Sequence, residues 1–159
     1  MKEIPLTKGL VALVDDEDYE RAMLYTWYAN HGYAIRATPR VSGIQGFQHM
    51  SNYIMRAPNT VMFDHKDRNP LNNQRFNLRP CTHAQNMRNA VRPVGRSGYR
   101  GVSYTPQGNK HWCASIKINS LCKRLGCFDD PAMAARVYDA AAVKYHGEFA
   151  TLNFQEATK

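Results

Sequence analysis

The chain has 159 residues and a formal net charge of +8, from 21 lysines and arginines against 13 aspartates and glutamates. This length allows one ordinary domain or two small ones, and the 43% hydrophobic and 21% charged residues exclude a disordered chain. No apolar run approaches the roughly 18 residues of a membrane span. Residues 1–5 lack the features of an export signal, so we expect a cytoplasmic protein without a membrane partner.

The positive charge is distributed unevenly along the chain. Residues 1–60 hold six basic and six acidic side chains, residues 61–96 hold seven and two, and residues 97–159 hold eight and five. A neutral front followed by a basic centre and tail indicates a polyanion as partner. On charge alone, a basic surface that only keeps the protein soluble is the alternative.

The cysteines show no metal-binding or disulfide pattern. They lie at Cys81, Cys113, Cys122 and Cys127, without a C-x-x-C pair. With no export signal, we expect reduced thiols. Cys81 and His83 could suggest a zinc site together with His65, but no four-ligand spacing supports it.

Residues 1–46 predict a small α+β lead-in to which we assign no chemistry. Alternation from Ile4 to Val14 predicts a strand, and the acids at 15–18 predict the start of a helix, where the helix dipole favours negative charge. Residues 28–37 predict a hairpin.

Residues 47–90 predict a helix followed by strand, loop, strand and helix. The expected elements are a helix over 47–57, strands over 60–63 and around 77–79, and a helix from Thr82 to Asn89. Thr82 and Gln85 have the spacing of a capping box, in which each side chain bonds the other's backbone N–H.

The last third of the chain predicts a second domain. Residues 91–98 contain Pro, Gly and Arg without periodicity and predict a linker. The domain itself, residues 99–155, should hold three strands and one helix: 99–104, 112–118, 122–128 and 131–146. Asp130 suits the N-cap of that helix, and Gly147 suits its C-terminal end.

Four polar residues in the central segment are candidates for phosphodiester hydrolysis. Asp64 and His65 follow a strand, Asn77 lies twelve residues after the histidine, and Asn86 lies nine residues further on. Mg²⁺ prefers oxygen ligands and takes one or two from protein, which Asp64 and Asn86 can supply, with Mn²⁺ as an alternative. His65 can take the proton from the attacking water. An Asp-His pair alone is weak evidence, because in most chains such a pair is structural or incidental.

The fuller string, DHKDRNPLNNQRFNLRPCTHAQNMRN over residues 64–89, closely resembles the core of HNH endonucleases, in the His-Asn-Asn variant of phage homing endonucleases. The resemblance implies a ββα-metal site with His65 as general base, Asp64 and Asn86 as metal ligands, and Asn77 bracing the loop. The basic residues expected to contact phosphate are Arg68, Arg75, Arg79 and Arg88. The alternative is that they are exposed arginines that only keep a basic domain soluble.

One pair of residues departs from that family. A His-Arg pair is usual thirteen and twelve residues before the metal-binding Asp, where this chain has Ser51 and Asn52. A histidine lies two positions earlier, at His49, and on a helix two positions rotate a side chain by roughly 200°. We therefore expect His49 not to replace the pair, and the missing arginine to slow cleavage.

The strand WCASIKI places Cys113, Ser115 and Lys117 on a polar face, opposite an apolar face for the helix. A sheet with such a face can enter the major groove of DNA, and a face that is only solvated is the alternative. SGYRGV, this strand and the helix region strongly resemble the APETALA/ethylene-response-factor DNA-binding domain over residues 97–154. The family's contact positions carry Arg100, Ser103, Ser115, Lys117 and Arg124, and also Cys122 and Cys127.

Together these patterns predict an α+β protein: a ββα-metal HNH nuclease core followed by a three-stranded antiparallel sheet packed on one helix. The predicted function is site-directed, metal-dependent hydrolysis of double-stranded DNA, by a monomer in the host-cell cytoplasm if phage-encoded. One alternative is a non-catalytic, sequence-specific DNA-binding regulator with a decayed nuclease core. An RNA-binding protein is a further alternative, although RNA readers usually display aromatic residues on an open sheet face.

Overall fold

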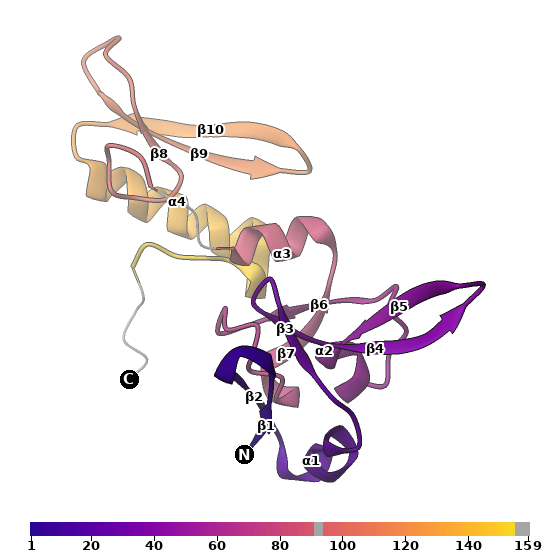
Figure 1. Cartoon of the computed structure of the whole chain (residues 1–159). Coiled ribbons are helices and arrows are strands. Elements are labelled where there is room, and N and C mark those ends of the chain that lie inside the picture. Colours follow the sequence, from indigo (N-terminus) through magenta and orange to yellow (C-terminus); the bar gives the residue numbers. More distant parts are fainter. Residues whose placement is uncertain (91–93, 155–159) are drawn as a thin grey trace. The chain divides into compact units, whose positions relative to one another are not determined.

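The computed structural model describes residues 1–90 and 94–154, and the chain divides into two compact units, Met1–Asn86 and Met87–Lys159 (Figure 1). We call them the N-terminal and the C-terminal unit. The described strands form several small antiparallel sheets, so the fold is mixed α and β. In this part of the chain no helix is long and apolar enough to cross a membrane. Residues 91–93 of the predicted linker and residue 155 lie outside the described residues.

The N-terminal unit begins with a hairpin of two short strands. Where one strand over residues 4–14 was predicted, a 3-10 turn separates the strands, because Lys8 and Gly9 adopt positive φ angles of 65° and 69°. The elements of this unit are β1 (Lys2–Pro5), η1 (Thr7–Gly9), β2 (Val11–Val14), α1 (Asp16–Met23), β3 (Tyr28–Asn30), β4 (Tyr33–Val41), β5 (Ile44–His49), α2 (Met50–Ile54), β6 (Met62–His65), η2 (Arg75–Asn77) and β7 (Leu78–Cys81). Helix α3 (His83–Asn89) follows and spans the boundary between the units at residues 86 and 87.

Strands β3, β4 and β5 form one antiparallel sheet. The hairpin predicted over residues 28–37 is confirmed by the pairing of β3 with β4. The helix predicted over residues 47–57 is too long, because residues 44–49 pair with β4 as strand β5 and only Met50–Ile54 is helical. His49 is therefore the last residue of a strand, and not part of a helix.

The core of the N-terminal unit joins the predicted lead-in to the predicted nuclease segment. One buried cluster contains Ile4 and Trp27 from the first segment and Met50, Ile54 and Leu78 from the second. The Trp27 indole also donates to the carbonyl of Ala22 at 2.9 Å. The first 46 residues thus form part of the same hydrophobic core as the strand pair that carries Asp64 and His65.

The C-terminal unit has a three-stranded sheet with a helix along one face (Figure 1). Its elements are β8 (Val102–Tyr104), β9 (Trp112–Ile118), β10 (Leu121–Phe128), α4 (Pro131–His146) and η3 (Gly147–Phe149). The predicted caps are confirmed: the Asp130 carboxylate accepts the N–H groups of Ala132 and Met133, and Gly147 has a φ of 54°. At Gly101, with a φ of 75°, any side chain would collide with the ring of Tyr138, so the helix approaches the sheet closely there.

The expectation of reduced thiols is wrong for two cysteines. Cys113 on β9 and Cys127 on β10 form a disulfide, because the antiparallel register places them directly opposite each other. Among the described residues, Cys81 and Cys122 are free thiols. Cys113 was also predicted to lie on the open polar face of the sheet, from the alternation of its strand, but the residue is buried.

Candidate active site and nucleic-acid interface

Strands β6 and β7 pair antiparallel and place Asp64 opposite Arg79. The Asp64 carboxylate is buried, and its Oδ2 accepts from Nε and Nη2 of Arg79 at 2.8 and 2.6 Å. Asp64 lies within β6, one residue beyond the predicted strand end at residue 63, and Arg79 lies within β7, in the strand predicted around 77–79. The carboxylate is therefore held by a charged partner, which offsets the free-energy penalty of its burial.

His65 is buried beside Asp64 and faces the following loop. Its Nε2 lies 3.5 Å from Oδ1 of Asn73, and 6% of the residue is exposed. Burial lowers the pKa of the imidazole below its ordinary value, and outweighs the Asn73 contact and the charges of Asp67 and Asp64, which act in the opposite direction. Burial therefore favours the neutral imidazole, which is the form that can accept a proton.

Asn77 holds together the loop that leads away from His65. Its Nδ2 donates to Oδ1 of Asp67 at 2.9 Å and to the carbonyl of Asn72 at 2.8 Å. Its Oδ1 accepts the N–H of Asp67 at 3.0 Å. Burial raises the pKa of the Asp67 carboxyl, but the hydrogen bonds from Asn69, Asn72 and Asn77 outweigh burial and hold that pKa below its usual range.

Helix α3 brings Asn86 back to β6. The predicted capping box is present: Thr82 N donates to Oε1 of Gln85 at 2.7 Å, and Gln85 N donates to Oγ1 of Thr82 at 3.3 Å. Asn86 Nδ2 lies 3.8 Å from Sδ of Met62. Because Met62 and Asp64 are two residues apart on one strand, Asn86 lies against the strand face that carries Asp64.

The arginines predicted to contact phosphate lie in different surroundings. Arg75 and Arg79 have internal partners: Arg75 binds Asp18 at 2.7 Å, and Arg79 is buried against Asp64. Arg68 is exposed on the loop after β6, and Arg88 is half-buried in the last turn of α3. The surface position expected for all four is therefore found for Arg68 and in part for Arg88.

The lead-in, to which sequence reasoning assigned no chemistry, anchors the loop that faces His65. Leu13 on β2 donates its N–H to the Leu71 carbonyl and accepts the N–H of Asn73, at 2.8 Å each. Asn73 in turn faces His65. No residue-type signal marks this contact in the sequence, because it is made by backbone groups.

Asp18 on α1 anchors the end of the same loop. It is 2% exposed and accepts from Arg75 and from Arg21, at 2.7 and 2.6 Å. Burial raises the pKa of the Asp18 carboxyl, but the hydrogen bonds from Arg75 and Arg21 outweigh burial and keep the pKa below its ordinary value. The carboxylate thus stays charged at neutral pH.

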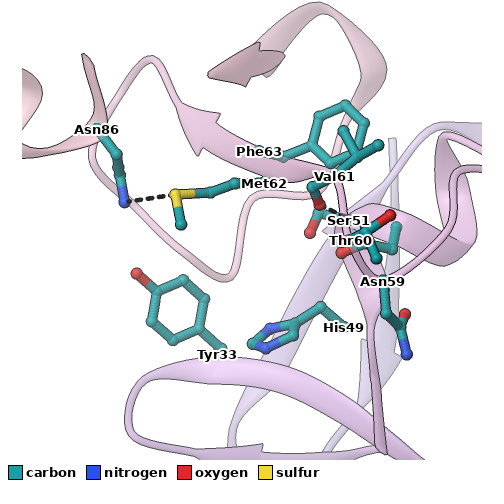
Figure 2. A pocket seen from close by; sticks show the side chains of 10 residues that line it. Tyr33, His49, Ser51, Asn59, Thr60, Val61, Met62, Phe63 and Asn86 are labelled. Atoms are coloured by element: carbon teal, nitrogen blue, oxygen red, sulfur yellow. Dashed lines mark hydrogen bonds between the residues drawn. The ribbon is translucent and has the colours of Figure 1, made fainter. Parts of the chain in front are cut away.

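Two residues of the sheet formed by β3, β4 and β5, Tyr33 and His49, form a group with His65. The ring of Tyr33 is 5.5 Å from the ring of His49 and 6.1 Å from that of His65, measured between centroids. Figure 2 shows Tyr33, His49, Met62 and Asn86 around one pocket of about 260 Å³. The sequence could have indicated that Tyr33 and His49 lie together only if residues 44–49 had been predicted as a strand paired with β4.

The two positions that depart from the expected His-Arg pair also line this pocket. Ser51 and Asn52 are buried on α2, and Asn52 Nδ2 donates to the carbonyls of Pro58 and Val61 at 2.8 Å each. Asn52 thus holds the turn before β6. His49 is not rotated away from this region along a helix, contrary to what the sequence predicted. It is the last residue of β5, precedes the helix and lines the same pocket.

In the C-terminal unit, most of the residues predicted to contact DNA line a hollow of about 380 Å³. Its lining includes Arg100, Ser103, Ser115, Lys117 and Cys122. Arg124 lies outside it, exposed, with Nη2 3.2 Å from Sγ of Cys113. Arg100 is half-buried and donates to the carbonyls of Arg88 and Ala90 at 2.8 and 3.1 Å. The sheet face thus concentrates polar and basic groups as the alternation predicted, with Arg100 partly engaged internally.

Comparison with known proteins gives a distant relative over most of the chain. The chain is 27% identical over 147 residues to an uncharacterized HNH endonuclease of Acanthamoeba polyphaga mimivirus, which covers 92% of this chain and 76% of the viral protein. No family model and no solved structure matches the chain.

A shorter part of the chain is similar to two plant proteins. Two AP2/ERF and B3 domain-containing proteins of Oryza sativa subsp. japonica are 44% and 42% identical over 61 and 64 residues. The chain spans only 16% and 19% of the length of these rice proteins. The chain thus has one distant relative named as an endonuclease and a partial likeness to AP2/ERF proteins.

Proposed function

We propose that this protein is a site-directed DNA endonuclease that hydrolyses a phosphodiester bond with the help of one divalent cation. His65 takes the proton from the attacking water, and Asn77 braces the loop next to it. The observation that carries the proposal is a buried imidazole directly beside a buried carboxylate, on a strand pair followed by a helix that returns an amide to the same strand face. The distant relative named as an HNH endonuclease supports it.

The oxygen donors near β6 fit a hard cation that takes few protein ligands. The described residues contain no group of three or more His, Cys, Asp and Glu side chains that could hold a metal ion. Asp64 and Asn86 would hold the cation, and Mg²⁺, with Mn²⁺ as alternative, suits one carboxylate and one amide oxygen. When bound, such a cation stabilises negative charge on the phosphate and on the leaving oxygen.

We further propose that the C-terminal unit positions the enzyme on duplex DNA. The hollow on its sheet face and the exposed Lys117 and Arg124 support this role, because basic side chains on an open sheet face can contact phosphates and base edges. The partial likeness to AP2/ERF proteins supports it too. Phosphate contacts would supply affinity and register, and binding should weaken steeply with salt.

One observation favours a second candidate, a DNA-binding protein without nuclease activity. Arg79 occupies Oδ2 of Asp64 through two hydrogen bonds, and the usual His-Arg pair is replaced by Ser51 and Asn52. Such a protein would bind DNA equally well with and without divalent cations and would not cut it.

The two candidates separate in a cleavage selection. The full chain is incubated with a randomised duplex library in Mg²⁺, in Mn²⁺ and with a chelator, and the new ends are mapped at nucleotide resolution. The nuclease proposal predicts recurrent cuts that require the cation, with DNA binding retained in the chelator. Binding to a recurrent sequence without cuts in either metal would refute it in favour of the second candidate.

A further inference from the structure

The pocket beside β6 contains hydrogen-bonding side chains that the proposed mechanism does not use. It is lined by Tyr33 from β4, His49 from β5 and Asn86 from α3, among others, and its volume is about 260 Å³. Pockets for small ligands start at roughly 300 Å³, so this one suits a fragment of a larger ligand, such as one phosphodiester group. None of the described residues that line it is Asp, Glu, Lys or Arg.

Several polar groups of the pocket already have partners in the fold. Asn52 donates to the carbonyls of Pro58 and Val61, and Asn59 Nδ2 donates to the carbonyl of Phe47 at 2.9 Å. The rings of Tyr33 and His49 contact each other, and the ring of Tyr33 also lies near that of His65. Within the described residues, neither the Tyr33 hydroxyl nor the His49 imidazole forms a hydrogen bond. Tyr33 is 37% exposed, so its hydroxyl can meet a ligand that enters from solvent.

The sheet register brings these two side chains to one face. His49 pairs with Ile35, and Tyr33 lies two residues before Ile35 on the same strand, so Tyr33 and His49 are diagonal neighbours. Their rings meet edge to face, at 5.5 Å between centroids and 85° between planes. The same Tyr33 ring lies 6.1 Å from that of His65. A group bound between Tyr33 and His49 would thus lie close to the proposed general base.

We propose that Tyr33 and His49 bind the phosphodiester group that is cut, the Tyr33 hydroxyl and an N–H of the His49 imidazole each donating a hydrogen bond to a non-bridging oxygen. This inference rests on the proposed function and names two of its substrate-contacting residues. Preorganised donors aimed at an oxygen that gains negative charge stabilise the transition state more than the ground state. The pair would supply this stabilisation with neutral donors, in a pocket without a lysine or arginine in its described lining.

Two substitutions separate this role from packing. Tyr33→Phe keeps the ring and its contacts with both imidazoles and removes only the hydroxyl. His49→Ala removes the imidazole. Tyr28→Phe and His31→Asn serve as matched controls, since both residues are exposed in the same sheet region and line no part of the pocket. Asn suits position 31, where φ is 47°.

The test uses the full chain on a plasmid library with randomised inserts, in Mg²⁺ and with protein in excess. Single-turnover cleavage reports the chemical step, and titration of labelled duplex in a chelator reports binding. For Tyr33→Phe and for His49→Ala we expect cleavage roughly 100- to 1000-fold slower than wild type, with duplex affinity within about twofold of wild type. Both control variants should cleave as the wild type does.

The outcomes distinguish this inference from the proposed function. If the wild type cuts and Tyr33→Phe and His49→Ala cut at the same rate, the assignment is overturned while the nuclease proposal stands. An equal fall of both variants in cleavage and in duplex affinity would also overturn it, because the pair would then act in general binding. If His49→Ala does not fold, Tyr33→Phe alone decides. If the wild type does not cut, the proposed function fails and this inference with it.

Discussion

Replacing Asn77 by alanine should destabilise the N-terminal unit strongly. Its side chain donates to Asp67 Oδ1 and to the Asn72 carbonyl and accepts the N–H of Asp67, at 2.8–3.0 Å, and Asn77 is 1% exposed. A hydrogen bond to a carboxylate contributes roughly 1.5–3 kcal/mol and a neutral one about 1 kcal/mol, and buried partners left without a replacement lose more. We therefore expect the free energy of unfolding to fall by about 3–5 kcal/mol.

Asn77→Asp tests whether the hydrogen bonds or the packing carry this effect. Aspartate has almost the same shape and keeps the acceptor for the N–H of Asp67, but it removes the donor. Its second oxygen would face the Asp67 carboxylate and the Asn72 carbonyl, which are both acceptors. Asn77→Asp should therefore destabilise the unit as much as Asn77→Ala at pH 7, and less at acidic pH, where a carboxyl can be protonated.

The assay is urea unfolding of the full chain, in a Trp112→Phe background. Trp27 is 1% exposed in the N-terminal unit, so its fluorescence then reports that unit. Asn69→Ala is the graded control, because this exposed side chain on the same loop accepts one hydrogen bond, from Leu71 N. It should lose about 1 kcal/mol. A loss below about 1 kcal/mol for both Asn77 variants would refute the reasoning.

Three further predictions follow from charged side chains. Asp18→Asn should lower the free energy of unfolding by about 3 kcal/mol at pH 7, because it removes a buried, paired charge. In urea titrations, the difference in stability between this variant and the wild type should shrink as the pH falls through the lowered pKa of Asp18, because the wild type then loses the same charge. Arg79→Ala should lower the free energy of unfolding by about 3–5 kcal/mol in the same assay, because it leaves Asp64 buried without this partner. Arg40→Ala, on the exposed surface, should change the free energy of unfolding by less than about 0.5 kcal/mol. Equal effects of the two substitutions would contradict the role of the buried pair. Lys117→Ala should reduce by about one the slope of log affinity for duplex DNA against log salt, and Lys144→Ala, the same charge change on α4, should leave the slope unchanged.

The elements with strong local signals could be predicted from the sequence. Asp130 and Gly147 bound α4 correctly, and Thr82 with Gln85 located the start of α3, because capping depends on residues only a few positions apart. The three strands of the C-terminal unit were predicted within a few residues, because alternation and turn residues are also local signals.

The parts that depend on contacts between distant segments could not be predicted in this way. Residues 44–49 form a strand only because β4 is available to pair with them, and the predicted helix over 47–57 concealed this pairing. As a consequence, Tyr33 and His49 received no role. The disulfide of Cys113 and Cys127 likewise follows from a strand register that the spacing of the cysteines does not reveal.

Charge alone also gave too simple a view of the arginines. Arg75 and Arg79 belong to a basic segment and were assigned to phosphate, yet the fold uses them to bind Asp18 and Asp64. A buried carboxylate requires a partner, and the nearest arginine in space satisfies it. Which arginine this is depends on the register of β6 and β7, and not on the local sequence.

The most direct test of the nuclease proposal compares His65→Ala with His83→Ala in plasmid nicking with Mg²⁺. His83 is an exposed histidine at the start of α3 and provides the matched control. Loss of a general base slows a reaction by roughly 10²–10⁴-fold, so we expect His65→Ala to nick at least about 100-fold more slowly than the wild type, and His83→Ala to nick at the wild-type rate. Nicking by His65→Ala at the wild-type rate would contradict the proposal.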